Sequence, residues 1–151
     1  MQIITAPEPL KINSKSIFLA GSIEQDKATR WQDEVIEKLK QYNYTILNPR
    51  RKVWDASWEQ RIDNPNFNEQ VNWELDALGK ADVILMYFDP KTKSPISLLE
   101  LGLFAKSGKL IVCCPDGFWR KGNVDVVCDR FGIRQFLKLE DVIDFIKNKI
   151  Q

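Results

Sequence analysis

The feature that most constrains the fold is the alternation of short apolar runs with longer amphipathic stretches along the whole chain. The runs are rich in aliphatic residues, and most are closed by Gly, Pro, Asn or Asp, a pattern typical of buried strands. The expected strands cover residues 16–20, 44–49, 81–88, 109–114 and 134–139. Strands that alternate with helices predict an α/β domain, in which helices cover both faces of a parallel sheet and sites lie at the carboxyl ends of the strands.

The stretches between these runs show the three- and four-residue spacing of helices with one buried face. Pro95 begins one of these stretches and Gly108 follows its end, and Gly79 closes another, as expected of helix start and stop signals. The expected helices cover residues 25–42, 67–79, 95–107 and 140–150. Two segments without a clear period are expected to be a loop, 50–66, and a long connection, 115–132. The whole chain, 1–151, is expected to be one domain, with 1–15 as an extended N-terminal segment.

Composition excludes several classes of function. The chain has no histidine, so Ser-His-Asp and Cys-His catalysis and histidine-based metal sites are excluded. Acid–base and nucleophilic catalysis would then depend on carboxylates, Lys, Tyr, Cys or Ser. The net charge of +1 marks no surface for nucleic acid or a membrane, and no apolar run has the length of a membrane span.

The N-terminus and the cysteines bear on the compartment. The first residues lack the apolar core of a signal peptide. Cys113, Cys114 and Cys128 do not make a disulfide framework, and the adjacent pair suits small core positions in a reducing compartment. We therefore expect a cytoplasmic protein.

One carboxylate interrupts the most apolar helix pattern of the chain, "KSPISLLELG". At about 100° per residue, Glu100 falls inside the apolar stripe that is expected to face the sheet. That stripe consists of Ile96, Leu99, Leu103 and Phe104. A Glu at this position is either an anomaly of an unusually hydrophobic core helix or part of a pocket.

The opposite side of the same helix is apolar as well, with Leu98, Leu101 and Ala105. A helix that is apolar all round is buried on all sides, so we expect this far side to contact another subunit.

The preceding helix carries a second candidate carboxylate. Glu74 falls at the edge of the stripe formed by Phe67, Val71, Leu75 and Leu78. An isolated buried carboxylate is costly, but two that converge can act as a nucleophile and its acid–base partner, as in retaining glycoside chemistry. For Glu74 alone, a boundary residue with its head in water remains an equal alternative.

Four segments together resemble the nucleoside 2-deoxyribosyltransferase family: "FLAGSI" (18–23), "NPRR" (48–51), "NWELDALGKADVILMYF" (72–88) and "TKSPISLLELG" (92–102). The chain is most similar to the branch of short proteins that carry "SPISLLELG". The resemblance implies a flavodoxin-like or Rossmann-like three-layer sandwich, for which we expect a five-stranded, mostly parallel sheet. It also implies a cofactor-free exchange of nucleobases on 2′-deoxynucleosides in nucleotide salvage, with retention through a covalent deoxyribosyl–Glu intermediate.

The resemblance assigns roles to several residues. Glu100 matches the nucleophile, and Glu74 matches a second acid that is Asp in better-known members. Gly21 and Ser22 match a loop beside the sugar or base, although a plain turn with Ser22 as a helix N-cap is an equal alternative. Ser94 stands where many members have an Asp near the nucleobase. Proton transfer to the leaving base is then expected from Asp89, from the loop 48–63, or from elsewhere.

Further residues are candidates for binding the base. Asn48, Arg50 and Arg51 end the second strand, and Trp54 and Trp58 could stack on a base. Solvated arginines and loop packing of the two tryptophans are equally open.

The family's members are oligomers, so the resemblance implies a homo-oligomer, a dimer or larger, whose sites a neighbour completes. Asn123 and Asp125 are the candidate contributions, with an ordinary loop as the alternative. The expected partners are deoxynucleosides and free bases, without nucleic acid, membrane, metal or cofactor. An N-glycoside hydrolase of nucleosides or nucleotides and a non-catalytic nucleotide-sensing module are the alternative functions.

Overall fold

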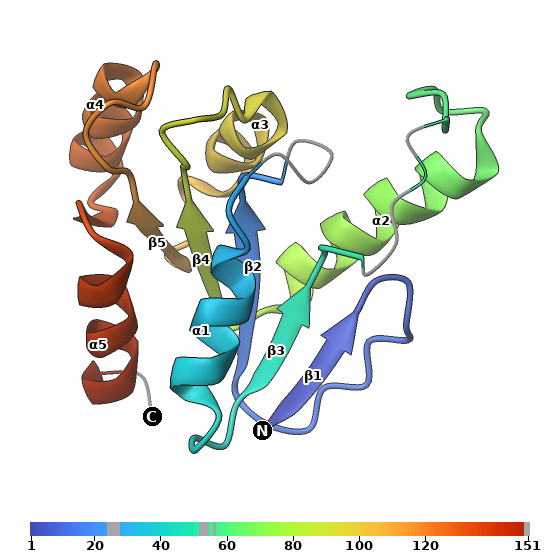
Figure 1. The fold of residues 1–151 in the computed structure, drawn as a ribbon, viewed down its shortest axis with the longest axis horizontal. Coiled ribbons are helices and arrows are strands. Elements are labelled where there is room, and N and C mark those ends of the chain that lie inside the picture. Colours follow the sequence, from blue (N-terminus) through green and yellow to red (C-terminus); the bar gives the residue numbers. More distant parts are fainter. Residues whose placement is uncertain (24–27, 52–54, 56, 150–151) are drawn as a thin grey trace.

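The computed structural model describes residues 1–23, 28–51, 55 and 57–149 (Figure 1). These residues form one open, all-parallel six-stranded sheet with the strand order β1-β3-β2-β4-β5-β6, and five helices. The strands are β1 (Gln2–Thr5), β2 (Ser16–Gly21), β3 (Thr45–Asn48), β4 (Val83–Tyr87), β5 (Leu110–Cys113) and β6 (Arg134–Phe136). The helices are α1 (Trp31–Leu39), α2 (Pro65–Lys80), α3 (Pro95–Phe104), α4 (Lys121–Phe131) and α5 (Leu139–Lys149). The predicted α/β class is confirmed.

The predicted strand count of five is wrong by one, because the N-terminal segment contains β1. This strand pairs in parallel with β3, from Gln2 opposite Thr45 to Thr5 opposite Asn48. Its four residues are too few for a clear alternation, so the pairing with β3 decides its conformation rather than local propensity.

The expected long connection also contains an element, the helix α4. Only Val124 and Cys128 of α4 are buried, and Gly132 ends it in the left-handed conformation with φ 63°. Two buried positions in eleven residues give a weak periodic signal, which explains why the sequence did not predict this helix.

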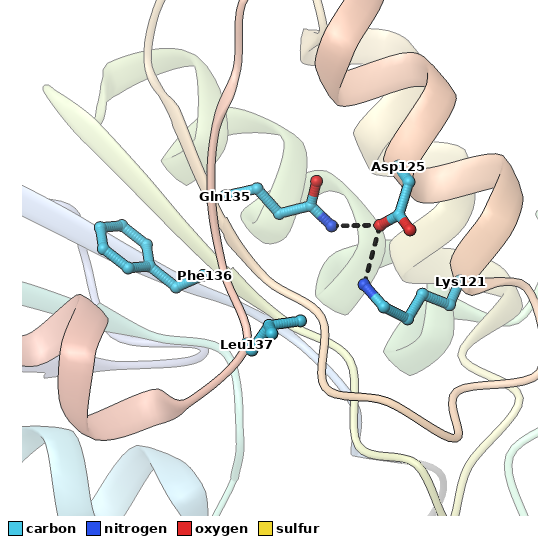
Figure 2. A pocket seen from close by; sticks show the side chains of 5 residues that line it. All are labelled: Lys121, Asp125, Gln135, Phe136 and Leu137. Atoms are coloured by element: carbon cyan, nitrogen blue, oxygen red, sulfur yellow. Dashed lines mark hydrogen bonds and ion pairs between the residues drawn. The ribbon is translucent and has the colours of Figure 1, made fainter.

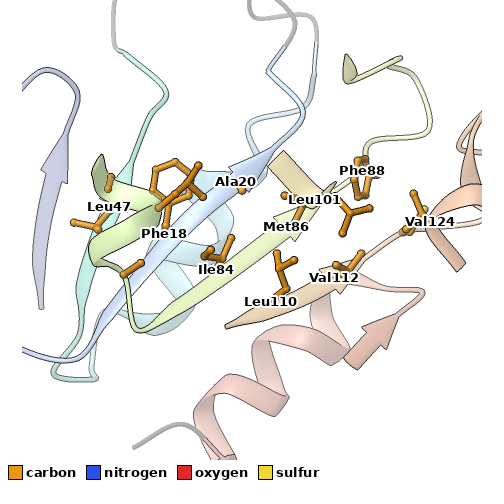
Figure 3. Close-up of a cluster of buried hydrophobic side chains, with 14 of the residues drawn as sticks. Phe18, Ala20, Leu47, Ile84, Met86, Phe88, Leu101, Leu110, Val112 and Val124 are labelled. Carbon is orange, nitrogen blue, oxygen red and sulfur yellow. The ribbon is translucent and has the colours of Figure 1, made fainter. Parts of the chain in front are cut away.

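The sheet separates two apolar cores. The helices α1 and α5 cover one face, where Trp31, Val35 and Ile143 pack on Leu19 and Leu85. The helices α2, α3 and α4 cover the other face, and Figure 3 shows part of that core. Side chains on both faces of β2 and β4 are therefore buried, as expected for central strands of a parallel sheet.

The buried side of α3 differs from the prediction. Ile96, Leu99 and Leu103 are 58–59% exposed, whereas Glu100 and Leu101 are buried. Because nearly every position of this helix is apolar, periodicity cannot show which side faces the sheet. Leu98, Leu101 and Ala105, which we expected at a subunit contact, thus lie wholly or partly buried. Of the four apolar residues in the expected inward stripe, Phe104 packs against the core and the other three are exposed.

The buried side of α2 is also shifted. Gln70, Trp73, Ala77 and Leu78 are buried, whereas Leu75 is 42% exposed. Trp73 fixes this orientation, because its ring packs near Phe18 and its Nε1 donates to Glu8 O at 2.8 Å.

Two further findings concern composition. Cys113, Cys114 and Cys128 are free and buried, which confirms the core positions predicted for the adjacent pair. Among the helices of the described residues, none is both long and apolar enough to cross a membrane.

The strand order positions the functional site. From β2 the chain continues to β3 on one side of it and then to β4 on the other side. The carboxyl ends of β2 and β4 therefore flank the point where the chain changes direction, which is where open α/β sheets bind ligands.

Candidate active site

Glu100 is a buried carboxylate on α3, the helix that follows β4. Pro95 at the start of α3 and Ser94 before it, in the left-handed conformation with φ 48°, direct the helix back over the sheet. Glu100 is 7% exposed, and no group of the described residues donates a hydrogen bond to its carboxyl. Burial, together with the neighbouring carboxyl of Glu74, raises the pKa of Glu100 to about 8.

Glu74 lies on α2, which begins at the N-cap Asn64, whose side chain accepts a hydrogen bond from Phe67 N. Glu74 keeps part of its surface open to solvent, but its carboxyl lies among protein atoms. Burial raises the pKa of Glu74 to about 7, although a hydrogen bond from Gln70 and the charge of Arg51 oppose the rise.

Glu74 and Glu100, from two successive helices, thus interact electrostatically, and their joint catalytic role stays a prediction. At a pH between about 7 and about 8, one of the two carboxyls is ionised, mostly Glu74, and the other keeps its proton. The ionised member can attack an electrophilic carbon, and the protonated member can deliver a proton.

Gln70 is a functional candidate that the sequence analysis missed. It is 3% exposed, and its Nε2 donates to Glu74 Oε1 at 2.7 Å and to Pro49 O at 3.1 Å. Its Oε1 accepts from Arg51 Nε at 2.5 Å. The available signal was its position four residues before Glu74, on the same side of α2.

Arg51 is held on two other sides. Its Nη2 lies 3.4 Å from Glu69 Oε1, and its guanidinium lies 5.0 Å from the ring centre of Trp58. The expected stacking residue Trp58 therefore contacts an arginine, and its stacking on a base stays a prediction. Trp54 lies outside the described residues.

A buried cluster of hydroxyl groups joins the ends of β2 and β4. Ser22 Oγ lies 2.5 Å from Ser94 Oγ and 2.9 Å from Thr92 Oγ1, and it accepts from Asp89 N at 2.8 Å. Ser22 therefore ties the loop after β2 to the start of α3. It is not a helix N-cap, because α1 begins at Trp31, and Thr92 is a second participant that the sequence analysis missed.

Gly21 has a structural reason for having no side chain. It adopts φ 132°, and a Cβ at this position would lie 2.1 Å from Tyr87 O. The close approach that the sequence indicated is thus met by the backbone of β4, and an additional approach of a ligand stays a prediction.

Asp89 is engaged by donors on both of its oxygens. Oδ2 accepts from Thr29 N at 3.0 Å and from Thr29 Oγ1 at 3.2 Å, and Oδ1 accepts from Lys91 N at 2.9 Å. A carboxylate that accepts three such bonds is suited to holding two loops together. This arrangement disfavours Asp89 as the donor of a proton to a leaving base.

Asn48 and Arg50 act in the same way at the end of β3. Asn48 Oδ1 accepts from Arg50 N at 3.0 Å. The Arg50 guanidinium is buried, and it donates to Ala28 O, to Thr29 O and to Gln32 Oε1. Arg50 is therefore not a solvated surface charge, and its contacts connect the loop after β3 with the loop before α1.

The two candidates on α4 point in different directions. Asn123 borders a groove of about 520 Å³ between α3 and α4, together with Leu98, Gly102 and Arg120. Asp125 instead borders a pocket of about 280 Å³ beside β6. Figure 2 shows Lys121 and Gln135 both directed at one carboxyl oxygen of Asp125.

The structure therefore brings together Glu74, Glu100 and, through Gln70, Arg51, with Ser22, Ser94 and Asp89 in a separate network. Asp125 belongs to neither group. Within the residues that the structure describes, no three His, Cys, Asp or Glu side chains are grouped so as to hold a metal ion.

The chain is similar to known proteins in sequence and in fold. The family model described as "Nucleoside 2-deoxyribosyltransferase like" matches residues 14–118. Among solved structures, the chain is similar to a conserved protein from Enterococcus faecalis V583, with a TM-score of 0.63 and 14% identity over 91% of this chain and 100% of that one. At this identity the likeness shows the fold alone. No curated protein matches the chain.

Proposed function

This chain belongs to the nucleoside 2-deoxyribosyltransferase-like family, and we propose that it exchanges the nucleobase of 2′-deoxynucleosides. The observation that carries the proposal is the pair Glu74–Glu100, two interacting carboxyls with raised pKa values on successive helices, of which Glu74 is held through Gln70 beside Pro49, after β3. Both lie within the segment that matches the family model.

The proposed first step is an attack at the anomeric carbon. A carboxylate oxygen of Glu100 forms a bond to C1′, and the bond between C1′ and the base nitrogen breaks, with its electron pair leaving on the base. Glu74, with a pKa of about 7, ionises before Glu100, with a pKa of about 8, so the attack requires that the one proton of the pair first passes from Glu100 to Glu74. Glu74 then gives this proton to the departing base. This assignment replaces Asp89, whose two oxygens accept hydrogen bonds from Thr29 and Lys91.

In the second step, an incoming base attacks C1′ of the deoxyribosyl–Glu100 ester from the same side as the first base. Its proton returns to Glu74, and the carboxylate of Glu100 is released. Two inversions give net retention. Every proton and electron pair is accounted for by two carboxyls and two bases, so the proposed reaction requires no cofactor.

We further propose that the protein is a homo-oligomer in the cytoplasm. Ile96, Leu99 and Leu103 form an exposed apolar row on α3, whose one charged residue, Glu100, is buried. A second copy of the chain is the proposed cover for this row. Asn123, in the adjacent groove, is the residue that we propose to contribute to a neighbouring site.

The test is an exchange assay with a 2′-deoxynucleoside, with and without a different free base, followed by chromatography. We expect a new deoxynucleoside from the wild type and none from Glu100→Gln. Asp76→Asn, an exposed change on α2, is the matched control and should retain activity. Release of free base without exchange would instead identify the N-glycoside hydrolase. Binding without either reaction would favour the sensing module.

A further inference from the structure

The amide of Gln70 has one orientation that satisfies all of its partners. Arg51 Nε can only donate, and Pro49 O can only accept. The amide oxygen must therefore face Arg51, and the amide nitrogen must face Pro49 and Glu74, as the contacts of 2.5, 3.1 and 2.7 Å show. Since Gln70 is 3% exposed, bulk water does not compete for these groups.

This amide therefore links a fixed cation to one end of the carboxyl pair. We propose that Gln70 is a positioning residue, which holds the Glu74 carboxyl by Oε1 and connects it to Arg51 through one buried amide. The inference rests on the proposed function, in which Glu74 gives the proton to the departing base and takes it back from the incoming one.

The groups around the carboxyl pair come from three elements. Arg51, in the segment after β3, favours the charged carboxylate of Glu74, and the charge of Glu74 in turn raises the pKa of Glu100 on α3. Glu69 on α2 pairs with Arg51 at 3.4 Å and so holds the guanidinium in place. Gln70 is the residue among these that touches both Arg51 and Glu74.

Loss of the Gln70 donor should make the pair harder to ionise. A hydrogen bond to a charged acceptor stabilises that charged form, and Gln70 lowers the pKa of Glu74 against the effect of burial. Without it, Glu74 would keep its proton to a higher pH, and its carboxyl would lose the contact that holds it in one position.

The first measurement is a ¹³C NMR titration of the glutamate side chains, assigned with Glu74→Gln and Glu100→Gln. In Gln70→Met we expect the first ionisation of the pair to move up by about one pH unit. Asn72→Met, which removes an exposed amide from the same helix, is the matched control and should leave it unchanged. An unchanged titration in Gln70→Met would overturn the inference.

A second variant tests the same inference in case Gln70→Met does not fold. Gln70→Asn keeps a polar amide but shortens the arm, so it should lose the contact with Glu74 and show the same upward shift. If Gln70→Met does not fold, the ¹³C titration of Gln70→Asn tests the inference, and an unchanged titration would overturn it.

The second measurement is the pH dependence of kcat/KM in the exchange reaction. The proposed acid Glu74 must be protonated, so its ionisation sets the alkaline limb, and we expect this limb to shift upward by about one pH unit in Gln70→Met while the acid limb stays in place. An equal loss at every pH would show a merely structural role. The titration needs no substrate, so a wild type without turnover would refute the proposed function while the effect of Gln70 on the pair is still measured.

Discussion

The carboxyl of Glu74 on α2 raises the pKa of the Glu100 carboxyl on α3, so the two residues act as one titrating unit. Neither helix would supply this unit alone. Glu74 comes from the helix before β4 and Glu100 from the helix after it.

Replacement of Glu74 should lower the pKa of its partner. In Glu74→Gln the repulsion from Glu74 is gone, so we expect Glu100 to titrate below its wild-type value of about 8 while burial still holds it above the usual range. A ¹³C titration of Glu100 measures this shift. Base exchange should fall by roughly 10²–10⁴-fold, because general acid catalysis is lost. An unchanged pKa of Glu100 would show that the pair is not coupled.

Replacement of Glu100 should stabilise the protein, and more so at high pH. Because the folded pKa of Glu100 lies above its unfolded value, the folded state binds more protons, and stability falls as pH rises from about 4.5 to above 8. We expect Glu100→Gln to gain roughly 2–4 kcal/mol relative to the wild type at about pH 9 compared with about pH 5. Urea unfolding at both pH values measures the difference, and an equal effect at both would contradict the raised pKa.

Asp89→Asn should lower the free energy of unfolding rather than remove a catalytic group. The substitution replaces a charged acceptor of three hydrogen bonds, so we expect a loss of about 1–3 kcal/mol in the free energy of unfolding. Urea denaturation measures this loss, and the exchange assay shows what activity the folded fraction keeps. A stable variant that has lost kcat would instead identify Asp89 as the acid for the leaving base.

Leu99→Lys should disrupt the proposed assembly. Leu99 is 59% exposed in the middle of the apolar row on α3, and a desolvated lysine at a subunit contact would be costly. Sedimentation analysis should show an oligomer for the wild type and a smaller species for the variant. Ile62→Lys, at a residue that is 86% exposed and away from α3, is the control and should keep the wild-type mass. A monomeric wild type would refute the proposed homo-oligomer.

The sequence predicted the layers of the fold because its strands are apolar and its helices are periodic. It did not predict β1, whose four residues are ordered by pairing with β3, or α4, which buries only two residues. The same limit applies to α3. In a helix that is apolar on all sides, the spacing of the apolar residues does not show which side faces the sheet. The row of Ile96, Leu99 and Leu103, which we expected to face inward, is exposed.

The candidate site was predicted in part for a related reason. Glu74 and Glu100 stand out because charge is rare in an apolar stripe. Gln70 and Thr92 do not stand out, because an amide or hydroxyl on a helix or loop is ordinary in a sequence. Their roles depend on contacts with residues distant in the sequence, Arg51 for Gln70 and Ser22 for Thr92. No local sequence pattern predicts such contacts.

The measurement that tests the central claim most directly is mass spectrometry of the protein quenched during incubation with a 2′-deoxynucleoside. We expect a deoxyribosyl adduct on the peptide that contains Glu100 and no adduct in Glu100→Gln. An adduct on another residue, or base exchange in Glu100→Gln at the wild-type rate, would contradict Glu100 as the nucleophile.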